Sequence, residues 1–246
     1  MPRITLPPKR LPFADVEIEF ATRIYLSPHP QYAWNEIIEG VEVRFPDGRL
    51  EKRAVMMGSA ARALRQVRPG PSAKEVYDRF FLENPDATLQ QLSEVNDRDQ
   101  LQQLCNQWQQ GIRQELGSIE LSQLSSYGRL RRPIDLYLMH LIAMSNEAES
   151  LRKALVPLLF VPLDKQILSK AFTKDELRDS GLPPRSSFGN IETEQVYLDF
   201  QDTLAKRARR MSGIVSKEVA PIYFDLLWRD RDKRVGGNLF EASPLR

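Results

Sequence analysis

Two short segments of the chain carry side chains that can do chemistry. Asp164 stands between an apolar stretch, residues 158–163, and a stretch with helical periodicity, residues 165–172. An aspartate at this place is a preferred helix N-cap, and an ionised carboxylate can also activate water or stabilise a developing positive charge. Segment 127–132 gathers an aromatic ring, a glycine and three arginines: Tyr127, Gly128, Arg129, Arg131 and Arg132. Arginines bind phosphates through paired hydrogen bonds, so this segment indicates a contact with nucleic acid.

Each segment also has an explanation that needs no function. Asp164 can be a helix cap and nothing more, and the arginines can belong to a solvated turn between two helices. His140 lies inside an apolar stretch and is better explained as a hydrogen-bonded core histidine than as a catalyst. Glu42, Asp47 and Glu51 superficially resemble the carboxylates of a metal-dependent nuclease, but their spacing is wrong, and Asp47 precedes a glycine, which fits a turn.

The composition limits which cofactors the chain can hold. Cys105 is the only cysteine, and His29 and His140 are the only histidines, so neither an internal disulfide nor a cysteine-rich zinc site can form. No phosphate-binding glycine loop, dinucleotide fingerprint or metal-binding motif is present. The sequence therefore predicts neither a metal nor an organic cofactor.

Charge and hydropathy are typical of an intracellular protein. The chain has 246 residues, of which 41% are hydrophobic and 28% charged, and its net charge is +2. Basic residues cluster at 206–210 and 229–234 as well as at 129–132, as in nucleic-acid-binding proteins, although each run also fits an ordinary solvated helix face. No apolar run approaches the roughly 20 residues that cross a bilayer, and the N-terminus lacks the apolar core of a secretory signal. We therefore expect a cytoplasmic protein, associated with the nucleoid if it binds DNA, and no membrane partner.

Periodicity predicts a mostly α-helical chain with one small N-terminal β-hairpin. Residues 1–30 hold six of the seventeen prolines and read as an extended arm with one short segment at 14–24. Residues 40–45 alternate with period two and meet a turn at 46–48, which is the pattern of a hairpin. Helices are expected at 59–68, from 72, from 88, at 100–115, 119–125, 133–144, 165–172, 192–211 and 222–228.

The predicted helices at 119–125 and 133–144 are joined by a tight basic turn, residues 127–132. Pro133 opens the second of these helices, which is apolar nearly all round and should therefore be buried. We predict two units: an N-terminal arm with the β-hairpin, residues 1–57, and a helical domain, residues 58–246. The arm and hairpin have no place in the chemistry above and are a candidate surface for a protein partner.

The order of short helix, basic turn, buried helix and an aspartate opening a further helix resembles the helix-hairpin-helix DNA glycosylases. Residues 119–229 are most similar to the archaeal 8-oxoguanine glycosylases. The matching pieces are Leu121-Ser122-Gln123-Leu124-Ser125, Val161-Pro162-Leu163-Asp164, Tyr197, Gln201 and Asp225-Leu226-Leu227-Trp228. The resemblance implies a glycosylase-like helical bundle in which the turn binds DNA, Asp164 helps to expel the base, and an aromatic pocket receives the extruded base. Candidate rings for that pocket are Trp108, Tyr127 and Trp228.

The chain departs from this family at the basic turn. Gly128 is the only glycine where the family has Gly-x-Gly, and Arg132 stands at the place of the lysine that attacks the sugar. Arginine stays protonated and cannot be an amine nucleophile, so no Schiff base is expected there. The resemblance, with this departure, implies a DNA-binding protein that is either a monofunctional DNA glycosylase, a hydrolase of base-excision repair, or a glycosylase-like relative that has lost catalysis. The alternatives are a non-enzymatic DNA-binding subunit of a larger repair or defence complex and a metal-dependent nuclease.

Overall fold

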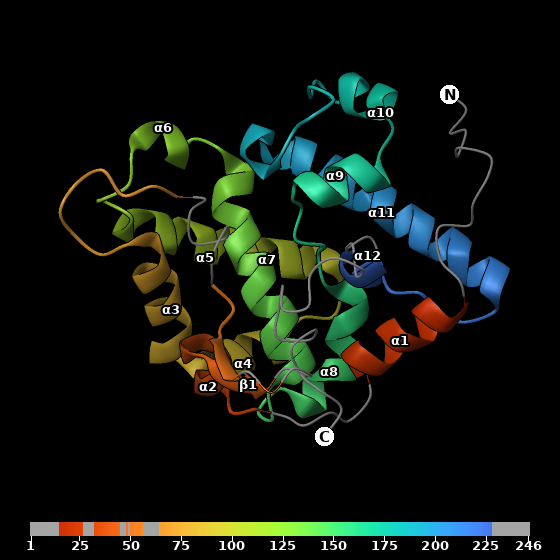
Figure 1. The fold of residues 1–246 in the computed structure, drawn as a ribbon, viewed down its shortest axis with the longest axis horizontal. Helices are drawn as coiled ribbons and strands as arrows, with labels where there is room; N and C mark the ends of the chain where they lie inside the picture. The colour runs from red at the N-terminus through yellow and green to blue at the C-terminus, as the bar shows by residue number, and fades with distance from the viewer. Residues whose placement is uncertain (1–14, 27–31, 45–47, 49, 57–63, 228–246) are drawn as a thin grey trace.

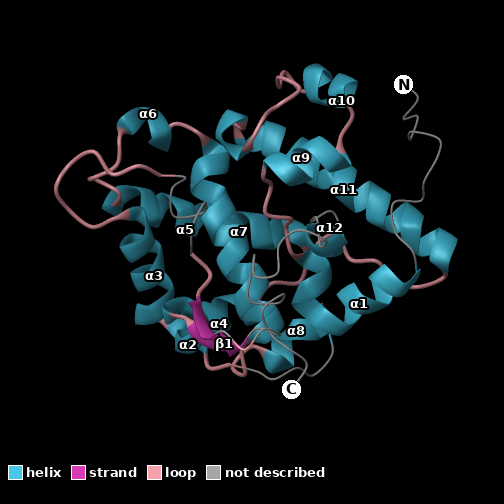
Figure 2. Ribbon diagram, viewed as in Figure 1, coloured by secondary structure: helices cyan, strands magenta, loops and turns pink. Residues whose placement is uncertain are grey.

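The computed structural model describes residues 15–26, 32–44, 48, 50–56 and 64–227 (Figure 1). These residues are mostly helical, as predicted, and Figure 2 shows a single pair of strands among them. Within these ranges no helix is long and apolar enough to cross a membrane.

The predicted β-hairpin is confirmed. Strand β1 (Val41–Arg44) pairs antiparallel with β2 (Leu50–Arg53), with Val41 opposite Arg53. Gly48, in the connection, has a φ of 84°, a left-handed conformation that glycine adopts without steric cost. Before the hairpin lie α1 (Asp15–Leu26) and α2 (Trp34–Glu39), so residues 15–26, expected as a short segment of an extended arm, form a helix.

The rest of the described chain alternates helices with short connections. The elements are α3 (Ala73–Glu83), α4 (Pro85–Ser93), α5 (Arg98–Glu115), α6 (Leu121–Leu124), α7 (Tyr127–Met144), α8 (Glu149–Leu155), η2 (Val156–Leu158), α9 (Lys165–Ala171), α10 (Lys174–Asp179), η3 (Phe188–Asn190), α11 (Glu194–Val215) and α12 (Tyr223–Leu227). Several helices begin where the sequence supplies a cap. Ser72 accepts a hydrogen bond from the backbone of Glu75, and Asp97 and Thr193 cap α5 and α11 in the same way.

Helix α7 runs through the centre of the molecule (Figure 1), and its predicted burial is confirmed because every residue from Leu130 to Met144 is buried. Its C-terminus is satisfied by Arg152 of α8, whose guanidinium donates to the carbonyl oxygens of Ile142 (3.0 Å) and Ser145 (2.9 Å). Arginine at this place also complements the partial negative charge of a helix C-terminus.

The N-terminal elements pack onto the same core as the later helices. Helix α1 contacts α12, with the rings of Tyr25 and Tyr223 stacked 5.6 Å apart. The first backbone N–H of α2, from Trp34, donates to both carboxylate oxygens of Glu147 at 3.0 Å. Residues on both sides of the predicted boundary at 57/58 therefore share one hydrophobic core.

Three predicted boundaries are wrong. Residues 64–68 of the helix expected at 59–68 are not helical: Val67 N donates to the carbonyl of Ser118 at 2.9 Å, and residues 59–63 lie outside the described chain. Helix α4 begins three residues before Thr88, with Pro85 at its first position. Helix α7 begins at residue 127, so the expected basic turn is the first part of a helix and Pro133 lies inside it.

The early start of α7 has a local cause. Ser126 is a good N-cap, and its hydroxyl accepts a hydrogen bond from the backbone N–H of Arg129 at 3.3 Å. A proline inside a helix removes one backbone hydrogen bond and normally costs about 3 kcal/mol. Here the burial of the helix outweighs that cost, and the connection between α6 and α7 shrinks to two residues, Ser125 and Ser126.

Candidate functional site

Asp164 is held in place by two neighbouring elements. Gln201 of α11 fixes the segment before it: Val161 N donates to the Gln201 side-chain oxygen (3.1 Å), and the Gln201 amide donates to Val161 O (2.8 Å). Asp164 Oδ1 accepts a hydrogen bond from the backbone N–H of Ile167 at 2.8 Å and caps α9, so the predicted cap is confirmed. Its other oxygen, Oδ2, lies 3.9 Å from Arg132 Nη2, and the side chain remains 23% exposed.

Arg132 is an internal cation beside this carboxylate. Its side chain is only 8% exposed, and its guanidinium lies over the ring of Phe188, 4.9 Å from the centroid. Stacking on an aromatic face and pairing with a carboxylate are the ordinary roles of a buried arginine. Arg132 therefore places a positive charge near Asp164, and its side chain is too buried to present itself to a phosphate at the surface.

The first turn of α7 does not offer free backbone N–H groups to an anion. The N–H of Tyr127 donates to Glu192 O at 3.2 Å, that of Gly128 to Ile191 O at 2.9 Å, and that of Arg129 to the Ser126 hydroxyl. A phosphate at a helix N-terminus needs such groups unpaired. The expected phosphate site at this turn is therefore wrong in its geometry.

Gly128 has a packing role. A Cβ added to it would lie 2.4 Å from the carbonyl oxygen of Phe188 and 2.9 Å from the Cβ of Ile191. Glycine allows the start of α7 to contact the backbone at 188–191 directly.

Arg131 is fully buried in a network that joins three helices. Its Nε donates to Asp135 Oδ1 and its Nη1 to the Gln102 side-chain oxygen, both at 2.7 Å. The Tyr197 hydroxyl donates to Asp135 Oδ2 at 2.8 Å, and the Tyr127 hydroxyl lies 3.1 Å from Arg131 Nη1. The prediction that Arg131 contacts DNA is therefore wrong for this conformation, because its guanidinium connects α5, α7 and α11.

The same network uses the hydroxyl of Tyr127. It donates to Asn106 Oδ1 at 2.7 Å, and the Tyr127 ring lies tilted against Tyr197, with centroids 5.3 Å apart. Tyr127 thus supports the interior, and a role as a stacking platform for a base has no geometric support. Burial raises the pKa of Asp135 to about 6, although Arg131 and Tyr197 both favour the ionised form.

Arg98 is a member of the site that the sequence pattern did not reveal. Its guanidinium carbon lies 4.5 Å from the centroid of Phe160, and that of Arg131 lies 4.8 Å from the same ring. Burial lowers the pKa of Arg98. The spacing of Arg131 and Asp135, four residues apart, was the local signal for an ion pair, whereas Arg98 and Tyr197 come from distant parts of the chain.

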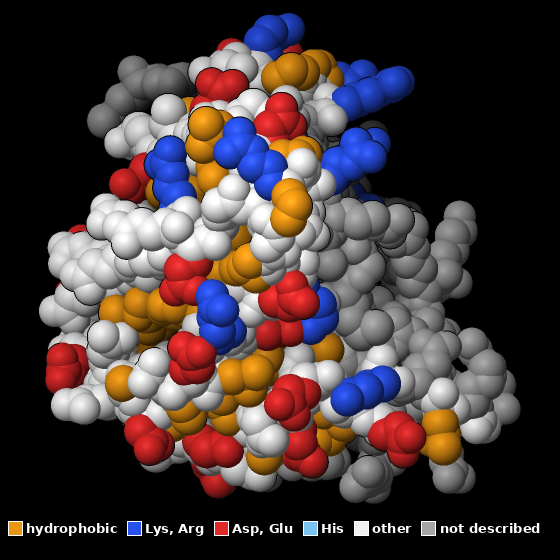
Figure 3. Space-filling view, turned by 90° about the vertical axis from the view of Figure 1, so that its left-hand side faces the viewer, with side chains coloured by type: hydrophobic (Ala, Val, Ile, Leu, Met, Phe, Trp, Pro, Cys, Tyr) orange, Lys and Arg blue, Asp and Glu red, His pale blue; other side chains and the backbone are white. Residues whose placement is uncertain are grey.

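Exposed cations lie around the start of α7 and α9 instead. Lys165 follows Asp164 and is exposed, Arg185 is exposed three residues before Phe188, and Arg129 is partly exposed. Figure 3 shows Lys and Arg side chains gathered on the upper part of one face, while Asp and Glu predominate on its lower part. The two views differ by a turn about the vertical axis, so the upper part of Figure 3 corresponds to the top of Figure 1, where α6 and α10 lie.

The basic run at 206–210 forms the second half of α11. Lys206, Arg209 and Arg210 are exposed, whereas Arg207 donates to Glu176 (2.6 Å) and packs on Phe172. Exposed lysines and arginines on the solvent-facing side of a helix need no ligand to explain them.

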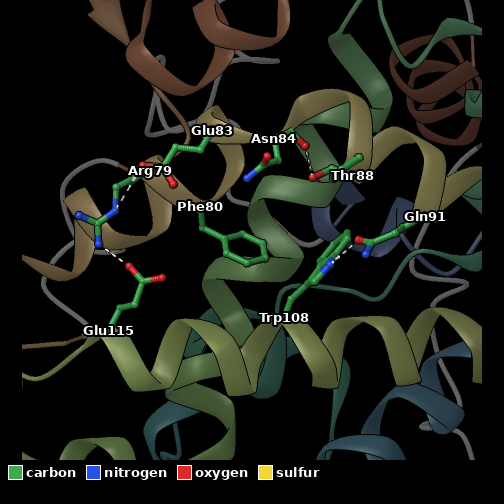
Figure 4. Close-up of a pocket in the computed structure, with 9 residues that line it drawn as sticks. Arg79, Phe80, Glu83, Asn84, Thr88, Gln91, Trp108 and Glu115 are labelled. Atoms are coloured by element: carbon green, nitrogen blue, oxygen red, sulfur yellow. Dashed lines mark hydrogen bonds and ion pairs between the residues drawn. The ribbon is translucent and has the colours of Figure 1, made fainter.

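A pocket of about 370 Å³ opens between α3, α4 and α5 (Figure 4) and contains Trp108, one of the three predicted stacking rings. In Figure 1, α3 lies to the left of α7 and α9 to its right, and neither Asp164 nor Arg132 is among the residues that line the pocket. Trp228 lies outside the described residues.

Within the described ranges no group of His, Cys, Asp or Glu side chains is arranged to hold a metal ion. No protein-family model, curated protein or solved structure matches this chain.

Proposed function

We propose that this chain binds DNA and hydrolyses an N-glycosidic bond, with Asp164 as the carboxylate that assists departure of the base. One observation carries the proposal. Asp164 is fixed by its own helix and by the preceding segment, which Gln201 holds with two hydrogen bonds, yet its side chain stays 23% exposed and its second oxygen lies 3.9 Å from Arg132. A carboxylate positioned in this way is suited to stabilise developing charge.

The chemistry needs no group beyond the carboxylate and water. As the bond between the sugar C1′ and the base breaks, the base takes the electron pair and positive charge develops on the sugar. Asp164 would stabilise that charge and accept a proton from the water that attacks C1′. Arg132 cannot replace water as the nucleophile because it stays protonated, so no covalent protein–DNA intermediate is expected.

Phosphates would be bound by the exposed cations near Asp164. Arg129, partly exposed, lies in the first turn of α7, Lys165 is the first residue of α9, and Arg185 is exposed in the segment between α10 and η3. Removing one phosphate-binding cation should reduce the slope of log K against log salt by about 0.9. Alanine at each of these three positions should therefore lower the salt dependence of duplex binding. Lys153→Ala, an exposed lysine on α8, is the matched control and should leave it unchanged.

A non-enzymatic DNA-binding subunit is the second candidate. The observation in its favour is that the pocket that contains Trp108 has neither Asp164 nor Arg132 among the residues that line it. A base extruded into that pocket would not meet the carboxylate. In this case the protein would bind DNA through the same cations and release no base.

Asp164→Asn separates the two candidates. Asparagine caps a helix about as well as aspartate, so stability should fall by no more than about 1 kcal/mol. We would incubate the protein with duplexes carrying a panel of modified bases, without added metal, and reveal abasic sites with alkali. Base release by the wild type should fall by about 100-fold or more in the variant. Asp97→Asn, which changes the equivalent cap of α5, is the control and should keep full activity.

Each result of this assay has a definite consequence. Full activity of Asp164→Asn would leave Asp164 as a cap alone. DNA binding by the wild type without release of any base would favour the non-enzymatic subunit, and absence of salt-dependent DNA binding would refute both candidates.

A further inference from the structure

The pocket between α3, α4 and α5 takes no part in the chemistry proposed at Asp164, yet its size lies within the range of small-ligand sites. Its aromatic wall comes from Phe80 of α3 and Trp108 of α5, whose rings meet edge to face with centroids 6.0 Å apart. In Figure 4 both rings lie in the space between α5 and the paired helices α3 and α4.

Two carboxamides stand at the edge of this space. The side-chain oxygen of Gln91 accepts a hydrogen bond from the indole N–H of Trp108 at 3.0 Å. Asn84, between α3 and α4, makes no capping bond with its side chain, and no hydrogen bond within the described chain engages its carboxamide. The pocket therefore combines aromatic surface with an unused hydrogen-bonding group.

The rim of the pocket carries a net negative charge. Arg79 forms an ion pair with Glu115, while the nearest oxygen of Glu83 lies 3.9 Å from Arg79 Nε. The side chains of Glu83 and Glu115 are 62% and 47% exposed. Two carboxylates face one cation, so a phosphate-bearing ligand is disfavoured and a cation is favoured. The weak contact of Glu83 leaves its oxygens able to accept a second guanidinium.

We propose that this pocket binds the arginine side chain of a partner polypeptide. A guanidinium is planar, stacks on aromatic faces, and pairs with a carboxylate through two parallel hydrogen bonds. Phe80 or Trp108 provides the face, Glu83 the carboxylate, and the Asn84 side-chain oxygen a further acceptor. Arginine fits better than lysine because the compact ammonium group of lysine cannot both stack on an aromatic ring and donate two parallel hydrogen bonds to a carboxylate.

Binding can be measured on the full chain by NMR. The probe is N-acetyl-arginine N-methylamide, followed through the assigned indole N–H resonance of Trp108. We expect a saturable shift. The citrulline analogue, which has the same shape without the charge, should bind about fivefold or more weakly. Cytidine tests whether the aromatic rings instead bind a nucleobase. Equal affinity for the arginine and citrulline probes, or tighter binding of cytidine than of the arginine probe, would overturn the proposal.

Two variants test the named contacts without touching the core. Glu83→Gln should weaken the arginine probe about two- to fivefold, whereas Glu149→Gln, an exposed glutamate on α8, should not change it. Ala87→Trp, at an exposed position that lines the pocket, should fill it and abolish the shift. Both pocket variants should keep the wild-type melting temperature. An unchanged affinity in Glu83→Gln, or a shift that survives Ala87→Trp, would show that the probe binds elsewhere.

Discussion

The role of Gly128 can be tested by replacing it with alanine, which should destabilise the protein by about 2–4 kcal/mol. A Cβ at this position would lie 2.4 Å from the Phe188 carbonyl oxygen, whereas ordinary contacts need roughly 1 Å more. The added Cβ is bonded directly to the backbone and the Phe188 oxygen is part of it, so neither can rotate away. Helix α7 and the segment at 188–191 must therefore separate. That movement would break the hydrogen bonds from Tyr127 N and Gly128 N, of 3.2 and 2.9 Å. Two such bonds contribute about 1–3 kcal/mol, and the local strain adds about 1–3 kcal/mol. Together they outweigh the gain of up to about 1 kcal/mol in helix propensity.

Gly111→Ala is the matched control. Gly111 lies within α5, and a Cβ there would meet nothing within 4 Å, so the same substitution should stabilise by up to about 1 kcal/mol. Urea unfolding measured for both variants should give shifts of opposite sign. In thermal unfolding, Gly128→Ala should lower Tm by roughly 5–15 °C. If Gly128→Ala proves as stable as Gly111→Ala while duplex DNA binding falls, the packing argument is refuted and Gly128 is a ligand contact.

Two further predictions concern the buried network around Arg131 and the two hydrogen bonds between Gln201 and Val161. Burial raises the pKa of Asp135 from the ordinary value of 3.8 to about 6. Between pH 3.8 and about 6 the folded protein therefore keeps a proton on Asp135 that the unfolded chain has lost. The contribution of Asp135 to the free energy of unfolding falls as the pH rises through this range. Arg131→Met leaves Asp135 without its cation, so its cost in urea unfolding should be about 3–5 kcal/mol at pH 7.5 and smaller at pH 5; an equal cost at both pH values would contradict the ion pair. Gln201→Leu leaves the N–H and carbonyl of Val161 without partners and should cost about 2–5 kcal/mol; a cost below 1 kcal/mol would mean that these two hydrogen bonds do not hold Asp164.

The elements that the sequence predicted well are those with their own local signals. Ser72 and Glu75 form a capping box, Asp164 caps α9, and the alternating residues at 41–44 and 50–53 pair as expected. The cap partners lie three residues apart and the strand partners no more than twelve, so a short stretch of sequence contains both sides of each interaction.

The start of α7 was mispredicted because only part of what fixes it is local in the sequence. Pro133 suggested a helix start, although the cap that matters is Ser126 and the partners of the first N–H groups come from residues 191 and 192. Arg131 looked like a surface cation because arginine is rarely buried. It is buried here because Gln102, distant in the sequence, accepts a hydrogen bond from its Nη1, and because the ring of Tyr197 lies against its guanidinium, 4.9 Å from the centroid.

The two proposed sites are compatible because they share no residue and carry opposite charge. DNA, a polyanion, would approach the end where Lys165 and Arg185 are exposed, near α9, and would be repelled by the carboxylates of Glu83 and Glu115 at the pocket. The pocket would then stay free of DNA and remain open to a basic polypeptide. A protein arranged in this way could hold DNA and a partner at once, which is also what the non-enzymatic alternative requires. The base-release assay and the arginine titration therefore report on independent surfaces, and failure of one leaves the other standing.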